Sequence, residues 1–82
     1  MKIFNITDFG AIGDGVTDNA KAIQAAIDQC SENGGGMVWI PGGSVYLTGP
    51  FDLKSYVNIH VESGAQLLAN PEKVIQDQGY GG

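Results

Sequence analysis

The sequence predicts an all-β fold, a parallel β-helix whose first coils follow an N-terminal capping α-helix. Two observations predict this architecture. Residues 37–50 match residues 58–71 after a shift of 21 positions, with apolar residues, turn glycines and prolines in corresponding places. A period near 20 residues, built from short β-branched runs, is typical of a solenoid whose units stack on one another. A helical pattern of apolar residues precedes the repeat.

The N-terminal part is expected to contain one short strand and one helix. The strand is predicted at residues 3–6, and the turn-rich stretch 8–15 follows it. Apolar residues spaced by three or four then predict a helix at about residues 18–31, with one apolar face. We expect Asp18 to cap its N-terminus and the run Asn33-Gly34-Gly35-Gly36 to end it. The predicted face consists of Val16, Ala20, Ile23, Ile27 and Cys30.

The first coils are predicted to span about residues 37–69. The repeat places Val38 beside Ile59 in neighbouring parallel strands, about 4.8 Å apart. An open solenoid end exposes apolar side chains and unpaired backbone groups, so the helix is expected to cover it. The tail, residues 70–82, loses the pattern, and we expect it to be truncated and without capping character. The predicted strands are residues 37–40, 45–48, 51–53, 56–61 and 65–69.

Composition excludes several classes of partner. The net charge is −5, and there is no arginine among 82 residues, which argues against a nucleic-acid partner. No apolar run approaches the roughly 20 residues that span a membrane. The polar start predicts no secretory leader, so the chain is expected to be cytoplasmic as written, or secreted or periplasmic if a leader has been removed. Cys30, the only cysteine, is predicted to be buried.

Two segments resemble a known group of proteins. Residues 7–19, with 22–27 and 34–36, are similar to the N-terminus of pectin-degrading β-helix proteins. Residues 45–55, with Val57 and the Gly-Ala pair at 64–65, resemble glycoside hydrolase family 28, the polygalacturonases. The resemblance implies a right-handed β-helix that hydrolyses α-galacturonide bonds in pectin with inversion and without a metal or other cofactor. It covers only the opening of such a protein.

The resemblance supplies no catalytic residue. Family members carry aspartates in an Asn-x-Asp segment and an Asp-Asp pair, then Gly-His-Gly and Arg-x-Lys segments. None of these occurs here. Inverting hydrolysis needs two carboxyl groups about 6.5–9.5 Å apart. We therefore expect no catalytic, cofactor-binding or metal-binding residue among the six aspartates, which are Asp8, Asp14, Asp18, Asp28, Asp52 and Asp77.

Other polar or aromatic residues have both a structural and a functional interpretation. Asp14 and Asp18 could bind a hard cation, but a turn and a helix cap explain them better. His60 is expected to be a solvated strand residue, and Lys54 to face solvent. Trp39, predicted to stack over His60, could offer its ring to a sugar, although packing against the N-terminal segment is favoured.

Three hypotheses for function remain. The first is the N-terminal capping portion of a polygalacturonase-like glycosidase, inactive alone, whose intact form binds pectin and continues into further C-terminal coils. The second is a non-catalytic β-helix module for binding or attachment, like a tailspike or adhesin. The third is a chain that associates with itself through its open end.

Overall fold

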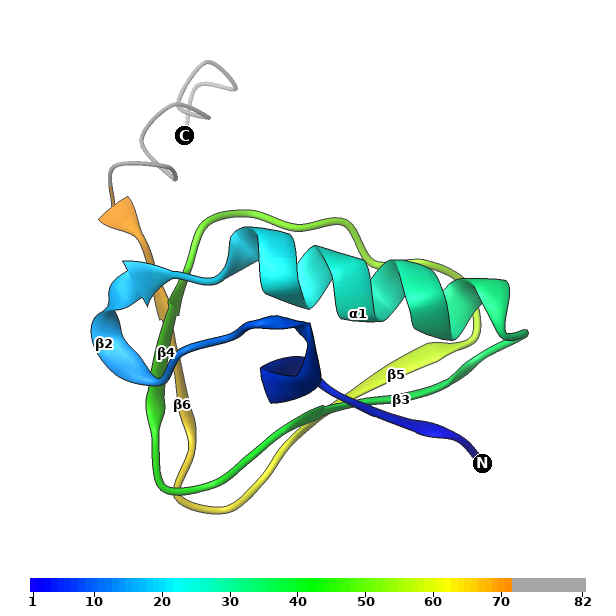
Figure 1. Ribbon diagram of the computed structural model, residues 1–82, viewed down its shortest axis with the longest axis horizontal. Coiled ribbons are helices and arrows are strands. Elements are labelled where there is room, and N and C mark those ends of the chain that lie inside the picture. The colour runs from blue at the N-terminus through cyan, green and yellow to red at the C-terminus, as the bar shows by residue number, and fades with distance from the viewer. Residues whose placement is uncertain (72–82) are drawn as a thin grey trace.

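The structure, a computed structural model, describes residues 1–71, which form two three-stranded parallel sheets and one α-helix (Figure 1). Sheet A has the order β1-β3-β5, and sheet B has the order β2-β4-β6. In chain order the elements are β1 (Ile3–Asn5), the 3-10 helix η1 (Ile6–Phe9), β2 (Asp14–Asp18), α1 (Ala20–Glu32), β3 (Gly36–Ile40), β4 (Val45–Thr48), β5 (Val57–Val61) and β6 (Gln66–Ala69).

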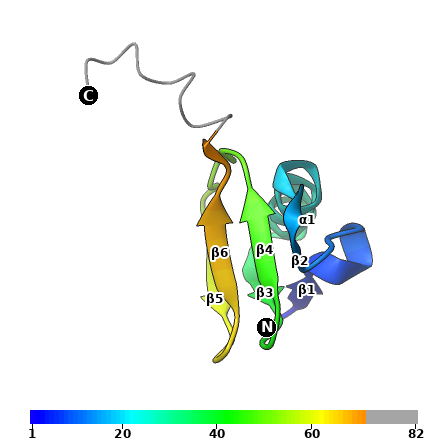
Figure 2. The same ribbon diagram turned by 90° about the vertical axis from the view of Figure 1, so that its left-hand side faces the viewer.

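The chain winds as a parallel β-helix. Each coil contributes one strand to sheet A and one to sheet B, and β3 and β4 lie between the strands of the preceding and following coils (Figure 2). Besides its two strands, each coil has a third side, and this side differs from one coil to the next. It is α1 before β3, and it is the extended segment 49–56 before β5 (Figure 1).

The 21-residue repeat predicts the strand register correctly. Val38 is paired with Ile59, and Ile40 with Val61, in the parallel ladder between β3 and β5. In sheet B, Tyr46 is paired with Leu67 in the same way. The corner glycines also correspond, since Gly43 and Gly64 have φ angles of 83° and 88°, which favour glycine.

The core lies between the coil and α1. Its fully buried side chains come from η1, from one face of α1, and from β3 and β4. Branched residues from facing elements thus fill the interior, as the alternation in the strands predicts. The buried cluster consists of Ile6, Ile23, Ala26, Ile27, Cys30, Val38, Ile40 and Tyr46.

The helix begins two residues later than the sequence predicts. Asp18 is the last residue of β2, and the N-cap position belongs to Asn19, whose side chain makes no capping bond. The carboxylate of Asp18 nevertheless accepts the amide hydrogen of Ala20 over 2.9 Å. Val16, expected on the apolar helix face, is a β2 residue and is 77% exposed. Pairing of β2 with β4 explains the difference, because the ladder holds residues 14–18 extended.

Two further expectations are corrected. The turn-rich stretch 8–15 contains the end of η1 and the start of β2. Residues 51–53 do not form a strand, because their neighbour on the third side is a helix, which offers no strand ladder. The other predicted strands agree with the structure to within one residue at each end.

Two expectations concern the membrane and the tail. Among residues 1–71, no helix has the length and apolar character needed to cross a membrane. Most of the predicted tail, residues 72–82, lies outside the described residues.

Candidate functional site

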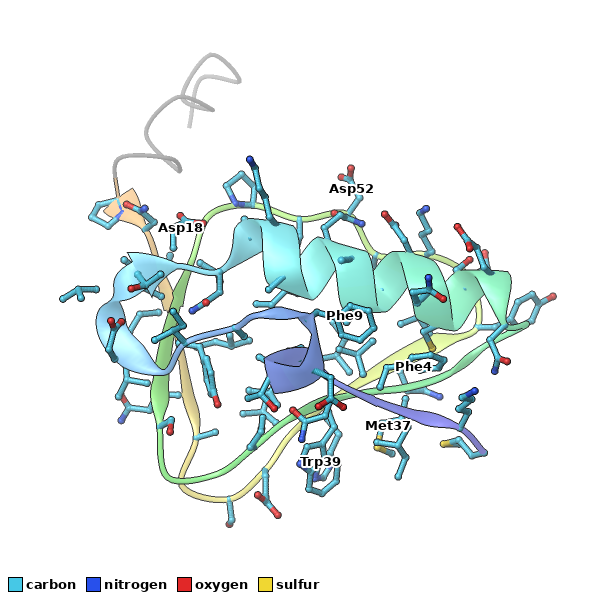
Figure 3. All side chains as sticks on the ribbon, in the orientation of Figure 1. Phe4, Phe9, Asp18, Met37, Trp39 and Asp52 are labelled. Atoms are coloured by element: carbon cyan, nitrogen blue, oxygen red, sulfur yellow. The ribbon has the colours of Figure 1, made fainter. Side chains whose placement is uncertain are left out.

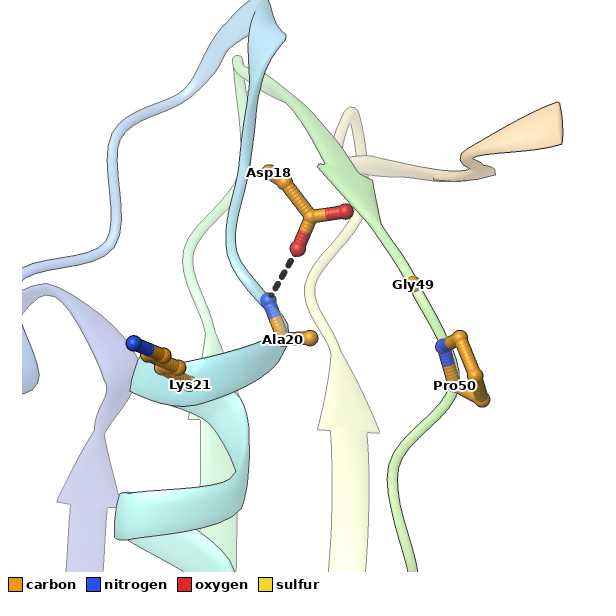
Figure 4. Close-up of a pocket in the computed structure, with 5 residues that line it drawn as sticks. All are labelled: Asp18, Ala20, Lys21, Gly49 and Pro50. Carbon is orange, nitrogen blue, oxygen red and sulfur yellow. Dashed lines mark hydrogen bonds between the residues drawn. The ribbon is translucent and has the colours of Figure 1, made fainter. Parts of the chain in front are cut away.

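A shallow pocket of about 450 Å³ opens where β2 leads into α1, and Asp18, Ala20, Lys21, Gly49 and Pro50 line it (Figure 4). One carboxylate oxygen of Asp18 accepts the Ala20 amide hydrogen. The other accepts a hydrogen bond from the side-chain amide of Asn70 over 2.8 Å. A single carboxylate held in this way joins β2, α1 and the segment after β6, and it does not form the pair of carboxyl groups that glycoside hydrolysis needs.

Asp14, which the sequence predicts to lie in a turn, is the first residue of β2. Its carboxylate accepts backbone hydrogen bonds from Val16, at 2.9 Å, and Thr17, at 2.8 Å, and another from the Thr17 hydroxyl, at 2.8 Å. The bonds from Thr17 and Val16 lower the pKa of Asp14, because they favour its charged form. No group of three or more potential metal ligands lies together within residues 1–71.

Trp39 and His60 form an aromatic pair on the outer face of sheet A. The ring centroids are 4.6 Å apart, and the planes are inclined by 22°. Trp39 and Met37 point away from the interior, whereas Phe4 and Phe9 point toward α1 (Figure 3). The predicted stacking of Trp39 over His60 is therefore confirmed, and the next strand neighbour of Trp39 on the other side is Asn5.

Lys54 is not simply solvated. Its ammonium group lies 2.7 Å from the carboxylate of Asp28 in α1. The contact lowers the pKa of Asp28 and raises that of Lys54, because each charge favours the other. Both side chains are about two-fifths exposed, so the ion pair contributes little to stability.

The role of Gln24 is not predicted by the sequence. Its side-chain amide accepts a hydrogen bond from the Asp52 backbone over 2.7 Å and donates one to the Asp52 carbonyl over 3.1 Å. The amide thus joins α1 to the third side of the next coil. The spacing of Gln24 and Asp28, four residues apart on one helix face, is the only signal that could have drawn attention to it.

The residues singled out from the sequence do not converge. Asp14 and Asp18 lie on β2 in sheet B, His60 on β5 in sheet A, and Lys54 on the third side. Cys30 is buried, as predicted, and desolvation raises the pKa of its thiol. A buried, protonated thiol is a poor nucleophile.

Several known proteins are similar to this chain in sequence. The family described as rhamnogalacturonase A/epimerase, pectate lyase-like, matches residues 3–77. The exo-poly-alpha-D-galacturonosidase of Dickeya chrysanthemi is 45% identical over 79 residues, which are 96% of this chain and 13% of that protein. Mannuronan C5-epimerase AlgE1 of Azotobacter vinelandii is 46% identical over 63 residues, 71% of this chain and 4% of the epimerase.

Solved structures resemble the fold. The family 28 exopolygalacturonase of Yersinia enterocolitica superposes with a TM-score of 0.78 at 46% identity, covering 88% of this chain and 12% of that one. A tailspike protein of the Escherichia coli bacteriophage HK620, in complex with a pentasaccharide, superposes with a TM-score of 0.71 at 29% identity, covering 82% of this chain and 14% of the tailspike. The chain thus spans a small part of the length of each of these relatives.

Proposed function

Because the chain belongs to the rhamnogalacturonase A/epimerase, pectate lyase-like family, we propose that it forms the N-terminal coils of an enzyme acting on a polysaccharide of uronic acids. The alignment with the galacturonosidase carries this proposal, since it extends over 96% of the chain at 45% identity. The relatives are named for galacturonan and for mannuronan, and both of these polymers are built from uronic acids. Hydrolysis of pectin-type α-galacturonide bonds is the reaction we favour, because residues 45–55 resemble the polygalacturonases.

We propose that α1 caps a right-handed coil. Its buried face carries Ala22, Ile23, Ala26, Ile27 and Cys30. Figure 1 draws the helix over the area that the coil encloses, and Figure 2 places it on the side of β1 and β2. Apolar side chains of β3, among them Val38 and Ile40, are fully buried beneath this layer. The arrangement supports a helix that protects the open end of a solenoid.

The catalytic groups of the intact enzyme are proposed to lie outside these 82 residues. The sequence holds neither an Asp-Asp pair nor an Asn-x-Asp segment. The carboxylates of Asp14, Asp18 and Asp28 are each engaged in hydrogen bonds or an ion pair. These 82 residues would instead begin the β-helix and support the coils that follow.

A chimera tests this function. Residues 1–69 would replace the corresponding first coils of the Yersinia exopolygalacturonase, with the junction placed so that the 21-residue spacing of the coils is kept. The release of galacturonate from polygalacturonate would then be measured. We expect the chimera to retain activity within about tenfold of the parent, and the 82-residue chain alone to release nothing above background. A folded but inactive chimera, or turnover by the isolated chain, would contradict the proposal. A scrambled α1 sequence in the same chimera is the control for the capping role.

The alternative is a non-catalytic module that attaches to a polysaccharide. The likeness to the tailspike supports it, as that structure holds a pentasaccharide. The same chimera distinguishes the two functions, because a binding module has no need to support catalysis in the attached coils.

A further inference from the structure

Tyr56 stands at a corner of the coil where the backbone favours glycine. The Val57 amide donates to the Lys54 carbonyl over 3.4 Å, which closes a turn with Tyr56 at its third position. Tyr56 has a φ angle of 65°, and no other residue with a side chain has a positive φ angle within residues 1–71. The 21-residue register places it beside Gly35, whose φ is 115°.

The left-handed backbone at this corner is imposed by the coil. The Tyr56 carbonyl accepts the amide hydrogen of Gly36 over 3.1 Å, which starts the pairing of β5 with β3. A Cβ atom on Gly35 would lie 2.7 Å from the same carbonyl oxygen, so the preceding corner accepts only glycine. Glycine would satisfy the backbone at position 56 as well, and with less strain than tyrosine.

The fold makes no use of the tyrosine ring. The residue is 83% exposed, and it does not belong to the apolar cluster of the core. Within residues 1–71 its side chain makes no hydrogen bond and no ring contact. Residues held in strained backbone conformations cluster at active sites and ligand-binding sites. Tyrosine suits recognition, because it combines a rigid apolar ring with a hydroxyl group.

We propose that Tyr56 is a binding contact for a sugar ring of the polysaccharide, an inference that rests on the proposed function. Charges of both signs lie around this corner. The ammonium group of Lys54 is 2.7 Å from the carboxylate of Asp28, and Lys2 lies on the neighbouring strand edge, where its carbonyl accepts the Met37 amide hydrogen. We therefore expect Tyr56 to contact the face of the sugar ring, whichever form the sugar carboxylate takes.

Binding of short oligogalacturonides to the 82-residue chain tests this contact. The probes are one methyl-esterified oligomer and its de-esterified form, followed by the NMR signals of the tyrosine rings and by calorimetry. Tyr56→Gly is expected to raise the urea midpoint of unfolding and to weaken binding of both oligomers at least tenfold. Tyr56→Phe is expected to keep binding within about threefold, and Leu53→Ala, an exposed change nearby, is the control.

Two results would overturn the inference. They are equal binding by Tyr56→Gly and the unchanged chain, and absence of binding to either oligomer. A stabilised Tyr56→Gly chain that also loses binding cannot be explained by a structural role. The chimera described above reports on the proposed function independently, since it measures turnover supported by the coils and needs no substitution at position 56.

Discussion

The indole of Trp39 in β3 stacks on the imidazole of His60 in β5, with centroids 4.6 Å apart, and so links two coils outside the core. Stacked aromatic pairs contribute about 0.5–1.5 kcal/mol beyond the area that they bury. We expect a double-mutant cycle of Trp39→Leu and His60→Leu to give a coupling energy in the lower half of that range, measured by urea unfolding. The pair Met37 and Asn58, neighbours in the same ladder, is the control. Equal coupling in both cycles would contradict a specific ring contact.

Gly42 is predicted to tolerate no side chain. A Cβ atom there would collide with the backbone oxygen of Ser63, and it would crowd the Glu62 carboxylate, which accepts the Gly42 amide hydrogen over 2.6 Å. Gly42→Ala should lower the free energy of unfolding by about 1–3 kcal/mol, because the coils must separate locally.

Gly43 provides the matched control for this corner. It has a φ of 83° but open space around a Cβ atom, so Gly43→Ala should cost about 1 kcal/mol from backbone strain alone. A larger loss at Gly43 than at Gly42 would show that strain, and not contact between coils, limits this corner.

The sequence predicts the repeated strands better than it predicts the elements that precede them. Val38 and Ile59 could be placed side by side because a repeat in sequence becomes a repeat in space when each unit stacks on the last. Residues 14–18 could not be recognised as a strand, since their partner is residues 45–48 and no local pattern encodes that pairing. A bulge-like register shift between Asp14 and Asp18 weakens the alternation further.

The polar contacts of the candidate site were the least predictable part. Asp18 could be assigned to the start of the helix because a capping aspartate has a local signature. Its bond to Asn70 and the bonds of Gln24 to Asp52 join residues that are far apart in sequence. Such contacts follow from the stacking of the third side on α1, which only the folded arrangement shows.

Asp14 should make stability fall in acid. Its folded-state pKa lies below the ordinary value of 3.8, so the unfolded chain binds the proton more readily. The stabilisation is complete above that ordinary value and is lost as the pH falls through the folded-state pKa. Asp14→Asn removes this titration, and we expect a shallower loss of unfolding free energy between about pH 5 and pH 2. Parallel pH profiles for the two chains, measured by urea unfolding, would contradict the assignment.

Gln24 lies on a helix, but we expect its side chain to stabilise the neighbouring segment as a paired strand would. Its amide gives the Asp52 backbone one acceptor and one donor, at 2.7 and 3.1 Å, as a neighbouring strand would. Gln24→Ala should lower the free energy of unfolding by about 1 kcal/mol, since water replaces these bonds in part. It should also speed hydrogen exchange at the Asp52 amide. Gln24→Glu should cost more at neutral pH, because it places a carboxylate beside Asp28, whose carboxylate now accepts a bond from the amide over 3.1 Å.

Gln29 is the matched control, because it is exposed on the same helix and its side chain makes no hydrogen bond within residues 1–71. Gln29→Ala changes helix propensity by the same amount as Gln24→Ala, so the difference between the two reports the side-chain hydrogen bonds of Gln24, which go to the Asp52 backbone and to Asp28. Unfolding free energies that change equally, with no change in exchange at Asp52, would mean that the helix is held by its apolar face alone. A difference of about 1 kcal/mol, together with faster exchange of the Asp52 amide in Gln24→Ala, would instead show that α1 takes the place of a strand on the third side of the coil.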